Sequence, residues 1–354
     1  MKADTVPPKT AAIAGAGIIG GAIAWSLAKA GWQVTVFDKS TWGSEASWAG
    51  AGMLAPGGEF FQPGVMAELA LASRRLYAAF VEELSAESGV PIDYRECGAI
   101  ETAYSAAEWD ALQQRARDQK SLGIESRPLT AEQIKTFSPY IRTEDLVGAL
   151  FFPDDALVDP RDMTRALRVA CEQRGVEILE QTPVEQIWLE KEYGQIGERR
   201  FDAVVLAAGA WSDSIRLMGV LPVPPAEPVK GHLLGFDLQL GACPTIVRHN
   251  QTYIVQRSHG LLIAGASSER IGFDRQIDRQ VAQEVYQHAM DLFPVLEKLQ
   301  PSDTWTGLRP GSDIVHLGQW QESRLFLAYG HYRNGILLTP VTAQRVTAAI
   351  TSSL

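Results

Sequence analysis

The spacing of hydrophobic positions differs between the ends and the middle of this chain. Near the N-terminus, an apolar run at 11–14 leads into an amphipathic stretch that ends at Ala30, followed by a second apolar run at 34–37. The same pattern returns in a helix that ends before Gly175 and in a strand and helix over 324–350. Short apolar runs joined by amphipathic stretches predict parallel strands covered by helices.

The middle of the chain carries alternating apolar and polar positions instead. These alternating runs lie at 232–236, 253–256 and 261–264, after a proline-rich segment at 221–228. A period of two predicts an antiparallel sheet with one covered face. The order of the two patterns predicts an α/β fold, in which a Rossmann-like domain is assembled from distant segments. An α+β domain, built on a mainly antiparallel sheet, is inserted into it.

The turn after the first predicted strand is rich in glycine, with the sequence Gly-Ala-Gly-Ile-Ile-Gly over 15–20. Gly15 permits the tight turn, Gly17 lets a pyrophosphate approach the backbone, and Gly20 lets helix and strand pack closely. The N-terminus of the following helix offers N–H groups and a positive dipole end to phosphates. Asp38, after the second strand, can accept hydrogen bonds from ribose hydroxyls and disfavours NADP. The motif predicts an adenine dinucleotide, and by itself leaves NAD and FAD open.

Composition and charge exclude several classes of protein. The net charge of −10 and the isoelectric point near 5.2 argue against a nucleic-acid or anionic-membrane partner. No window reaches the ~18 uninterrupted apolar residues of a membrane span, and the first ten residues lack the apolar core of a signal peptide. The three cysteines and six histidines show no disulfide or metal-ligand spacing. We expect a cytoplasmic enzyme without a metal.

Further blocks of sequence make the chain recognisable. They are SWAGAGML at 47–54, LAAGAWS at 206–212, PVKGH at 228–232, GLRPG at 307–311 and GHYRNGILL at 330–338. With the glycine-rich turn, they resemble the D-amino-acid-oxidase-like FAD-dependent oxidoreductases, and within them the glycine oxidases of thiamine thiazole synthesis. The resemblance runs from about residue 11 to residue 349 and implies FAD. Because no cysteine follows Arg309, we expect the FAD to be non-covalent.

The resemblance implies a cofactor site drawn from several parts of the chain. Ala51, Gly52 and Met53 would lie nearest the flavin, and the main chain of Val184 would contact the adenine end. Residues 331–338 would cross the pyrimidine side, where backbone N–H groups stabilise negative charge on the reduced ring. The expected cofactor residues are Gly15, Gly17, Ile18, Ile19, Gly20, Asp38, Lys39, Ala46, Ser47, Ala51, Gly52, Met53, Val184, Gly209, His331, Tyr332, Arg333, Asn334, Gly335, Ile336 and Leu337.

Arg309 is the expected anchor for a substrate carboxylate. Its planar guanidinium suits a carboxylate, and it lies between glycine and proline turns that would hold it in place. The resemblance implies the same anchor, and Tyr253 is expected to donate its hydroxyl to the same carboxylate. Arg333 is expected at the mouth of the active site, where it would add positive potential, with a plain surface arginine as the alternative.

The sequence offers no catalytic nucleophile, acid or base. Hydride transfer from a substrate α-carbon to a flavin needs a deprotonated amine, orientation and an electron acceptor. The resemblance implies oxidation of glycine or a small amino acid, imine hydrolysis to a 2-oxo acid and ammonia, and reduction of O2 to H2O2, serving thiamine thiazole synthesis. The expected partners are the amino acid and O2, without nucleic acid or membrane, in a homo-oligomer.

Three alternatives share part of this evidence. A sarcosine oxidase-like or D-amino-acid dehydrogenase-like enzyme would keep the cofactor and change the substrate or electron acceptor. A flavin-dependent tRNA-modifying enzyme is disfavoured by the acidic isoelectric point. A flavoprotein without catalysis is disfavoured by the presence of Arg309 and Tyr253. The loop over 312–318 is shorter than is usual in the family, which leaves the preferred amine open.

The changes of pattern also predict domain boundaries in this chain of 354 residues, which exceeds the usual size of one hydrophobic core. A flexible tail is expected over 1–9. The FAD-binding domain is expected over 10–88, 148–220 and 305–354, and the substrate-binding domain over 89–147 and 221–304.

Overall fold

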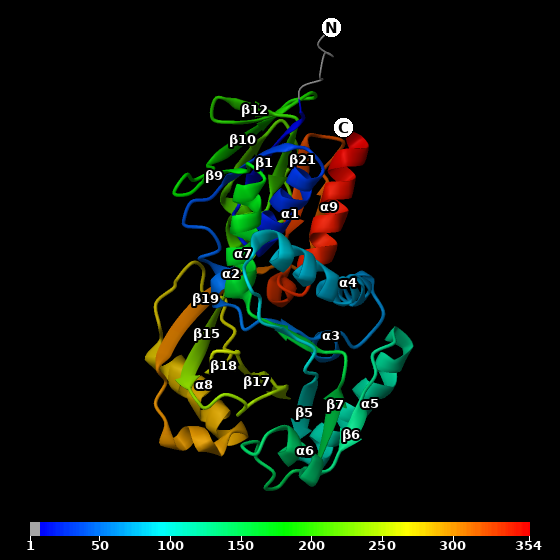
Figure 1. Ribbon diagram of the computed structural model, residues 1–354, viewed down its shortest axis with the longest axis vertical. Coiled ribbons are helices and arrows are strands. Elements are labelled where there is room, and N and C mark those ends of the chain that lie inside the picture. Colours follow the sequence, from blue (N-terminus) through cyan, green and yellow to red (C-terminus); the bar gives the residue numbers. More distant parts are fainter. Residues whose placement is uncertain (1–7) are drawn as a thin grey trace.

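The computed structural model describes residues 8–354, whose strands form two large sheets, the first in the upper half of Figure 1. The first sheet has six strands in the order β20-β21-β13-β1-β2-β9. Neighbours pair in parallel except β20, which runs antiparallel to β21. The strands are β1 (Thr10–Ala14), β2 (Gln33–Phe37), β9 (Glu177–Leu179), β13 (Ala203–Leu206), β20 (His316–Gln319) and β21 (Leu325–Tyr329). This arrangement confirms the predicted Rossmann-like sheet assembled from distant segments.

Alternate residues of this sheet enter two different hydrophobic cores. In β1, Ala11 and Ile13 pack with the helices, whereas Ala12 and Ala14 pack with a second, smaller sheet on the opposite face. The helices on the first face are α1 (Ile18–Lys29), α4 (Val65–Ser88), α7 (Pro160–Gln173) and α9 (Thr339–Ser353). The smaller sheet contains β12 (Arg199–Phe201), β11 (Gly194–Ile196), β10 (Gln186–Leu189) and β14 (Arg216–Met218). Burial on both faces explains why the central strands β1, β13 and β21 are almost entirely apolar.

Helix α1 differs from the amphipathic helix that the sequence predicted. It contacts both α7 and α9, and nine of its twelve residues are buried. A helix enclosed in this way needs no polar face. Helix α7 begins at a capped N-terminus, where the side chain of Asp159 accepts a hydrogen bond from the backbone N–H of Arg161 at 2.8 Å and Pro160 is the first helical residue.

The second large sheet, in the lower half of Figure 1, has eight strands in the order β19-β15-β18-β17-β16-β5-β7-β6. Every neighbouring pair is antiparallel except β16 and β5, so the mainly antiparallel sheet is confirmed. The predicted single covered face is wrong, because alternate residues of β17 and β18 enter two different hydrophobic cores. Helix α8 (Arg279–Leu292) packs against β15, β17 and β18. The strands are β5 (Ala99–Ala103), β6 (Arg127–Leu129), β7 (Gly148–Phe152), β15 (Glu227–Asp237), β16 (Ile246–His249), β17 (Thr252–Gln256), β18 (Leu261–Gly265) and β19 (Asp303–Gly311).

Short elements connect the two large sheets. The helices α2 (Ala46–Ala49) and α3 (Pro56–Glu59) flank β3 (Met53–Leu54), which pairs with β8 (Ala156–Val158). Strand β4 (Tyr94–Arg95) completes this three-stranded sheet. Two further helices, α5 (Ala106–Gln119) and α6 (Ala131–Phe137), lie at the β5–β6–β7 end of the second sheet in Figure 1. None of the helices within 8–354 is long and apolar enough to cross a membrane.

Strand pairing departs from two features of the predicted organisation. Strands β7 and β19 pair within the eight-stranded sheet, although the predicted boundaries assigned 148–220 and 305–354 to the FAD-binding domain. The predicted turns around Arg309 are also wrong, because the backbone hydrogen bonds of β15 hold 307–311 in a continuous strand. Pro310 is tolerated there since β19 is an edge strand. The boundaries stay a prediction, and most of the predicted tail lies outside the described residues.

Gly20 provides a test of the contact between α1 and the preceding turn. A methyl group at Gly20 would lie 1.9 Å from the carbonyl oxygen of Gly15. Because this neighbour is backbone, we expect Gly20→Ala to lower the free energy of unfolding by about 1–3 kcal/mol, measured by urea unfolding of the apoprotein. In the control Gly64→Ala, the new methyl group has no described atom within 4 Å. Equal losses in the two variants would contradict the packing role.

Candidate active site and cofactor cavity

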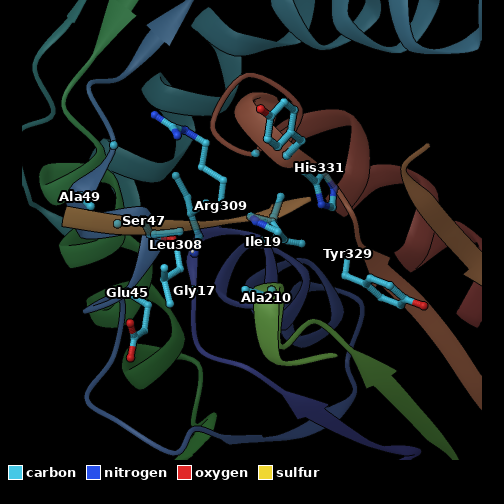
Figure 2. Close-up of a pocket in the computed structure, with 18 of the residues that line it drawn as sticks. Gly17, Ile19, Glu45, Ser47, Ala49, Ala210, Leu308, Arg309, Tyr329 and His331 are labelled. Carbon is cyan, nitrogen blue, oxygen red and sulfur yellow. Dashed lines mark hydrogen bonds between the residues drawn. The ribbon is translucent and has the colours of Figure 1, made fainter. Parts of the chain in front are cut away.

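A cavity of about 600 Å³ lies between the two large sheets. Its wall combines the turn before α1, the end of β2, the α2–β3 segment, the end of β13, strand β19 and the link between β21 and α9. Figure 2 shows Gly17 and Ser47 at one side of this cavity and Arg309 and His331 at another. Segments separated by more than three hundred residues in the chain therefore share one wall.

Two glycines in the first part of this wall lie so close to neighbouring backbone that no side chain would fit there. Gly15 has a φ of +114°, and a methyl group there would lie 2.3 Å from the carbonyl oxygen of Ala207. Gly52 has a φ of +96°, and a methyl group there would lie 1.8 Å from the carbonyl oxygen of Val158. Helix α1 begins directly at the cavity, where the N–H of Ile18 donates to the Ser47 hydroxyl at 2.9 Å. The exposed backbone suits a pyrophosphate and a flat ring.

Asp38 is held at the end of β2 by two backbone hydrogen bonds. Its Oδ2 accepts from the N–H of Ala16 and its Oδ1 from the N–H of Ser40, each at 2.7 Å. Each carboxylate oxygen keeps a second lone pair, so the group can still accept hydrogen bonds from ribose hydroxyls. Val184 also lines this part of the cavity. It lies in the loop between β9 and β10.

The link between β21 and α9 carries a neutral histidine. His331 is buried, and its Nε2 lies 3.0 Å from the Thr342 hydroxyl. Burial, with a smaller contribution from His316, lowers the pKa of His331 to about 3, so the imidazole carries no charge at neutral pH. Tyr332 follows with a φ of 49°, a left-handed conformation that is uncommon for a bulky residue and often found at functional sites.

The opposite end of the cavity carries polar groups from the eight-stranded sheet. The Nη1 of Arg309 donates to the carbonyl oxygen of Ser267 at 3.1 Å, and a methyl group at Gly231 would lie 2.4 Å from Nη2. Glycine at 231 therefore leaves room for the guanidinium. Burial raises the pKa of Tyr253, so its hydroxyl remains a hydrogen-bond donor. Arg333 is partly exposed, and its Nη2 lies 3.1 Å from Oε1 of Glu59.

Comparison with known proteins decides which cofactor the cavity serves. The model of the FAD dependent oxidoreductase family matches residues 10–349. This chain belongs to that family. It is 35% identical to glycine oxidase from Geobacillus kaustophilus, over 94% of this chain and 90% of that protein. The crystal structure of that oxidase superposes with a TM-score of 0.90 at 34% identity, covering 97% of this chain and 94% of the other.

Other relatives of this FAD-dependent oxidoreductase are longer or less similar. The chain is 35% identical to the bifunctional protein ThiO/ThiG of Synechocystis but spans only 51% of its length. A glycine oxidase structure from Bacillus cereus superposes with a TM-score of 0.89 at 28% identity, covering 98% of this chain and 96% of that one. The family assignment explains why glycine backbone forms part of the cavity wall and why an acidic residue, Asp38, lies at the end of β2: both are expected in an FAD site.

The structure brings together nearly all of the residues expected to contact FAD. All of them are described, and all except Gly20 and Leu337 line the cavity, as do Arg309 and Tyr253. Gly20 lies against the turn before α1, and Leu337 belongs to the hydrophobic core beside the helices. Their separate roles toward FAD stay predictions. Among residues 8–354, no group of three or more His, Cys, Asp or Glu could hold a metal ion.

A ring of side-chain contacts across the cavity wall was missed by the sequence analysis. Trp211 stacks on Phe273 with ring centroids 5.4 Å apart, and Nζ of Lys39 lies 3.7 Å from the Trp211 centroid. Glu45 accepts from Lys39 at 3.0 Å and from Arg275 at 3.2 Å. Trp211 falls in a block that the resemblance used. No local signal marks Glu45, Phe273 or Arg275, because the Trp211–Phe273 and Glu45–Arg275 contacts each join residues more than sixty positions apart.

The Trp211–Phe273 stack should slow the release of FAD, because it joins the two sheets across the cavity wall. Loss of an aromatic pair costs about 0.5–1.5 kcal/mol, so we expect Phe273→Ala to speed FAD dissociation about 2- to 10-fold. The recovery of flavin fluorescence after dilution measures this rate. Ile271→Ala is the matched control, since Ile271 is exposed in the same loop. An unchanged rate for Phe273→Ala would show that the stack does not retain FAD.

Proposed function

We propose that this FAD-dependent oxidoreductase oxidises glycine or another small amino acid. The observation that carries the proposal is that the Arg309 guanidinium and the Tyr253 hydroxyl belong to side chains that line the same FAD cavity. A charged fork beside a neutral donor is suited to a single carboxylate. The relatives named glycine oxidase, such as that of Geobacillus kaustophilus at 35% identity, support the same substrate class.

The residues of the chain would act mainly by orientation. Arg309 and Tyr253 would hold the carboxylate, so that the α-carbon faces the flavin and the amine remains free. FAD, when bound, supplies the electron acceptor for the hydride of the α-carbon. The neutral His331 adds no charge beside the ring, and the N–H groups before α9 would stabilise negative charge there. The imine product would hydrolyse to a 2-oxo acid and ammonia, and O2 would be reduced to H2O2.

Several finer features belong to the same proposal. The resemblance and the relatives named ThiO/ThiG support a role in thiamine thiazole synthesis. A non-covalent FAD fits the three free cysteines, Cys97, Cys171 and Cys243, which do not belong to the described cavity wall. We also propose that the enzyme is cytoplasmic and forms a homo-oligomer. Sarcosine oxidation, or an electron acceptor other than O2, would keep the same residues in the same roles.

The reaction can be tested directly on the purified protein. We expect a yellow protein with an acid-releasable flavin, which loses its colour anaerobically with a small amino acid and forms peroxide in air. Glycine, sarcosine, D-alanine and D-proline should be compared in a peroxide-coupled assay. A flavin spectrum that none of the four substrates bleaches would contradict the proposed function. Bleaching without peroxide would instead identify a dehydrogenase.

Removal of the proposed carboxylate anchor should weaken substrate binding without releasing FAD. A charge-assisted hydrogen bond contributes about 1.5–3 kcal/mol, so Arg309→Ala should raise KM roughly 10- to 100-fold. Steady-state kinetics gives KM, and the flavin absorbance of the purified variant gives FAD content. Arg75→Ala, an exposed arginine on α4, serves as the control. A wild-type KM in Arg309→Ala would place the anchor elsewhere.

A further inference from the structure

Glu59 brings a carboxylate to the substrate end of the cavity. The residue ends the short helix α3 and lines both the main cavity and a smaller adjoining cavity of about 160 Å³. Tyr253 and Arg333 line the same two cavities. The side chain of Glu59 is 21% exposed and pairs with Arg333 at 3.1 Å. Residues 55–62 follow the segment that is expected to lie nearest the flavin.

Buried polar side chains form hydrogen bonds with the backbone of α3 and of the residue that follows it. Asp155 accepts from the N–H of Gly57 at 3.1 Å, and Gln119 donates to the carbonyl oxygens of Gly57 and Phe60 at 2.8 and 2.7 Å. Asp155 and Gln119 are both buried. Such groups are stable in the interior only when they are hydrogen-bonded, so this arrangement favours one position of the segment.

Arg248 completes the support beneath Glu59. Its Nη1 donates to Asp155 at 2.8 Å, and a methyl group at Gly58 would lie 2.5 Å from the same atom. Gly58 therefore lies directly on the guanidinium. The Glu59 carboxylate is thus attached to a supported segment beside the substrate site rather than to an unsupported loop.

Two arginines and one glutamate line this end of the cavity, so one positive charge has no carboxylate partner there among residues 8–354. Arg309 and Arg333 supply two positive charges, and Glu59 is paired with Arg333. Burial raises the pKa of Glu59, whereas Arg333, Arg248 and Arg309 act in the opposite direction. A substrate carboxylate would neutralise Arg309. A second carboxylate would find Arg333 already paired and would meet the negative charge of Glu59 in a low-dielectric site.

We propose that Glu59 determines substrate specificity: with Arg333, it excludes amines that carry a second carboxylate. This inference rests on the proposed function and narrows it to monocarboxylic amino acids without an acidic side chain. Asp155, Gln119 and Arg248 are positioning residues, because they act through the backbone of α3. Discrimination against a wrong ligand by a repulsive charge is an established source of specificity.

The variant Glu59→Gln tests the charge while keeping the shape of the side chain. The measured quantity is the ratio of kcat/KM for D-aspartate to that for D-asparagine, two substrates that differ in a single charged group. We expect this ratio to rise at least tenfold in Glu59→Gln. In the double variant Glu59→Gln/Arg333→Gln most of this rise in the ratio should disappear. The Arg333 guanidinium, which would attract the second carboxylate once Glu59 is neutralised, is then also absent. Glu82→Gln, an exposed position on α4, should leave the ratio at the wild-type value.

A binding measurement separates this inference from the proposed reaction. Malonate and its monoamide form a similar pair of ligands, and their Kd values follow from changes in the flavin absorption spectrum. We expect Glu59→Gln to tighten malonate at least tenfold relative to the monoamide. A wild-type enzyme that oxidises no amino acid would overturn the proposed function. Unchanged ratios in Glu59→Gln, in turnover and in ligand binding, would overturn the role of Glu59.

Discussion

The direct contact between two pieces of backbone, at Gly15 and Ala207, is the constraint on which the rest of the structure depends. The turn after β1 passes so close to the end of β13 that a methyl group at Gly15 would lie 2.3 Å from the Ala207 carbonyl oxygen. This approach lets α1 start at the cavity wall, where a helix N-terminus is suited to a phosphate. It also places the ends of β13 and β21 beside the same cavity, because these strands are neighbours in the parallel sheet.

The substrate end depends on a different contact, the long antiparallel pairing of β15 and β19. This pairing runs over the whole of 303–311 and brings Arg309 to the cavity from the edge of the second sheet. Gly231, on the partner strand, leaves the space that the guanidinium occupies. The first sheet therefore brings exposed backbone to the cavity, and the second brings the charged and hydroxyl groups that the proposed function assigns to a carboxylate.

The sequence predicted the type of each sheet because that signal is local. Continuous apolar runs marked the parallel strands, and alternating runs marked the antiparallel strands. The alternation wrongly indicated one covered face, because distant parts of the chain bury both faces of β17 and β18. The same local signals failed where a neighbouring helix or strand, distant in sequence, determines the local structure. Helix α1 is apolar on most sides because α7 and α9 enclose it, and GLRPG is a strand because β15 is its neighbour.

For the site, motif blocks indicated most of the residues that line the cavity, including Arg309 and Tyr253. Glu59 and the ring through Glu45, Trp211 and Phe273 were missed, since their partners are distant in the chain.

By itself, then, the sequence determined the dinucleotide fold, the FAD family and the expected carboxylate anchor, because these depend on residue types at fixed short spacings. Only the tertiary structure decided which charges face one another in the substrate pocket. The pairing of Glu59 with Arg333 joins residues 274 positions apart, through a helix supported by Asp155 and Arg248. Electrostatic balance depends on distances across the cavity, and folding alone sets those distances.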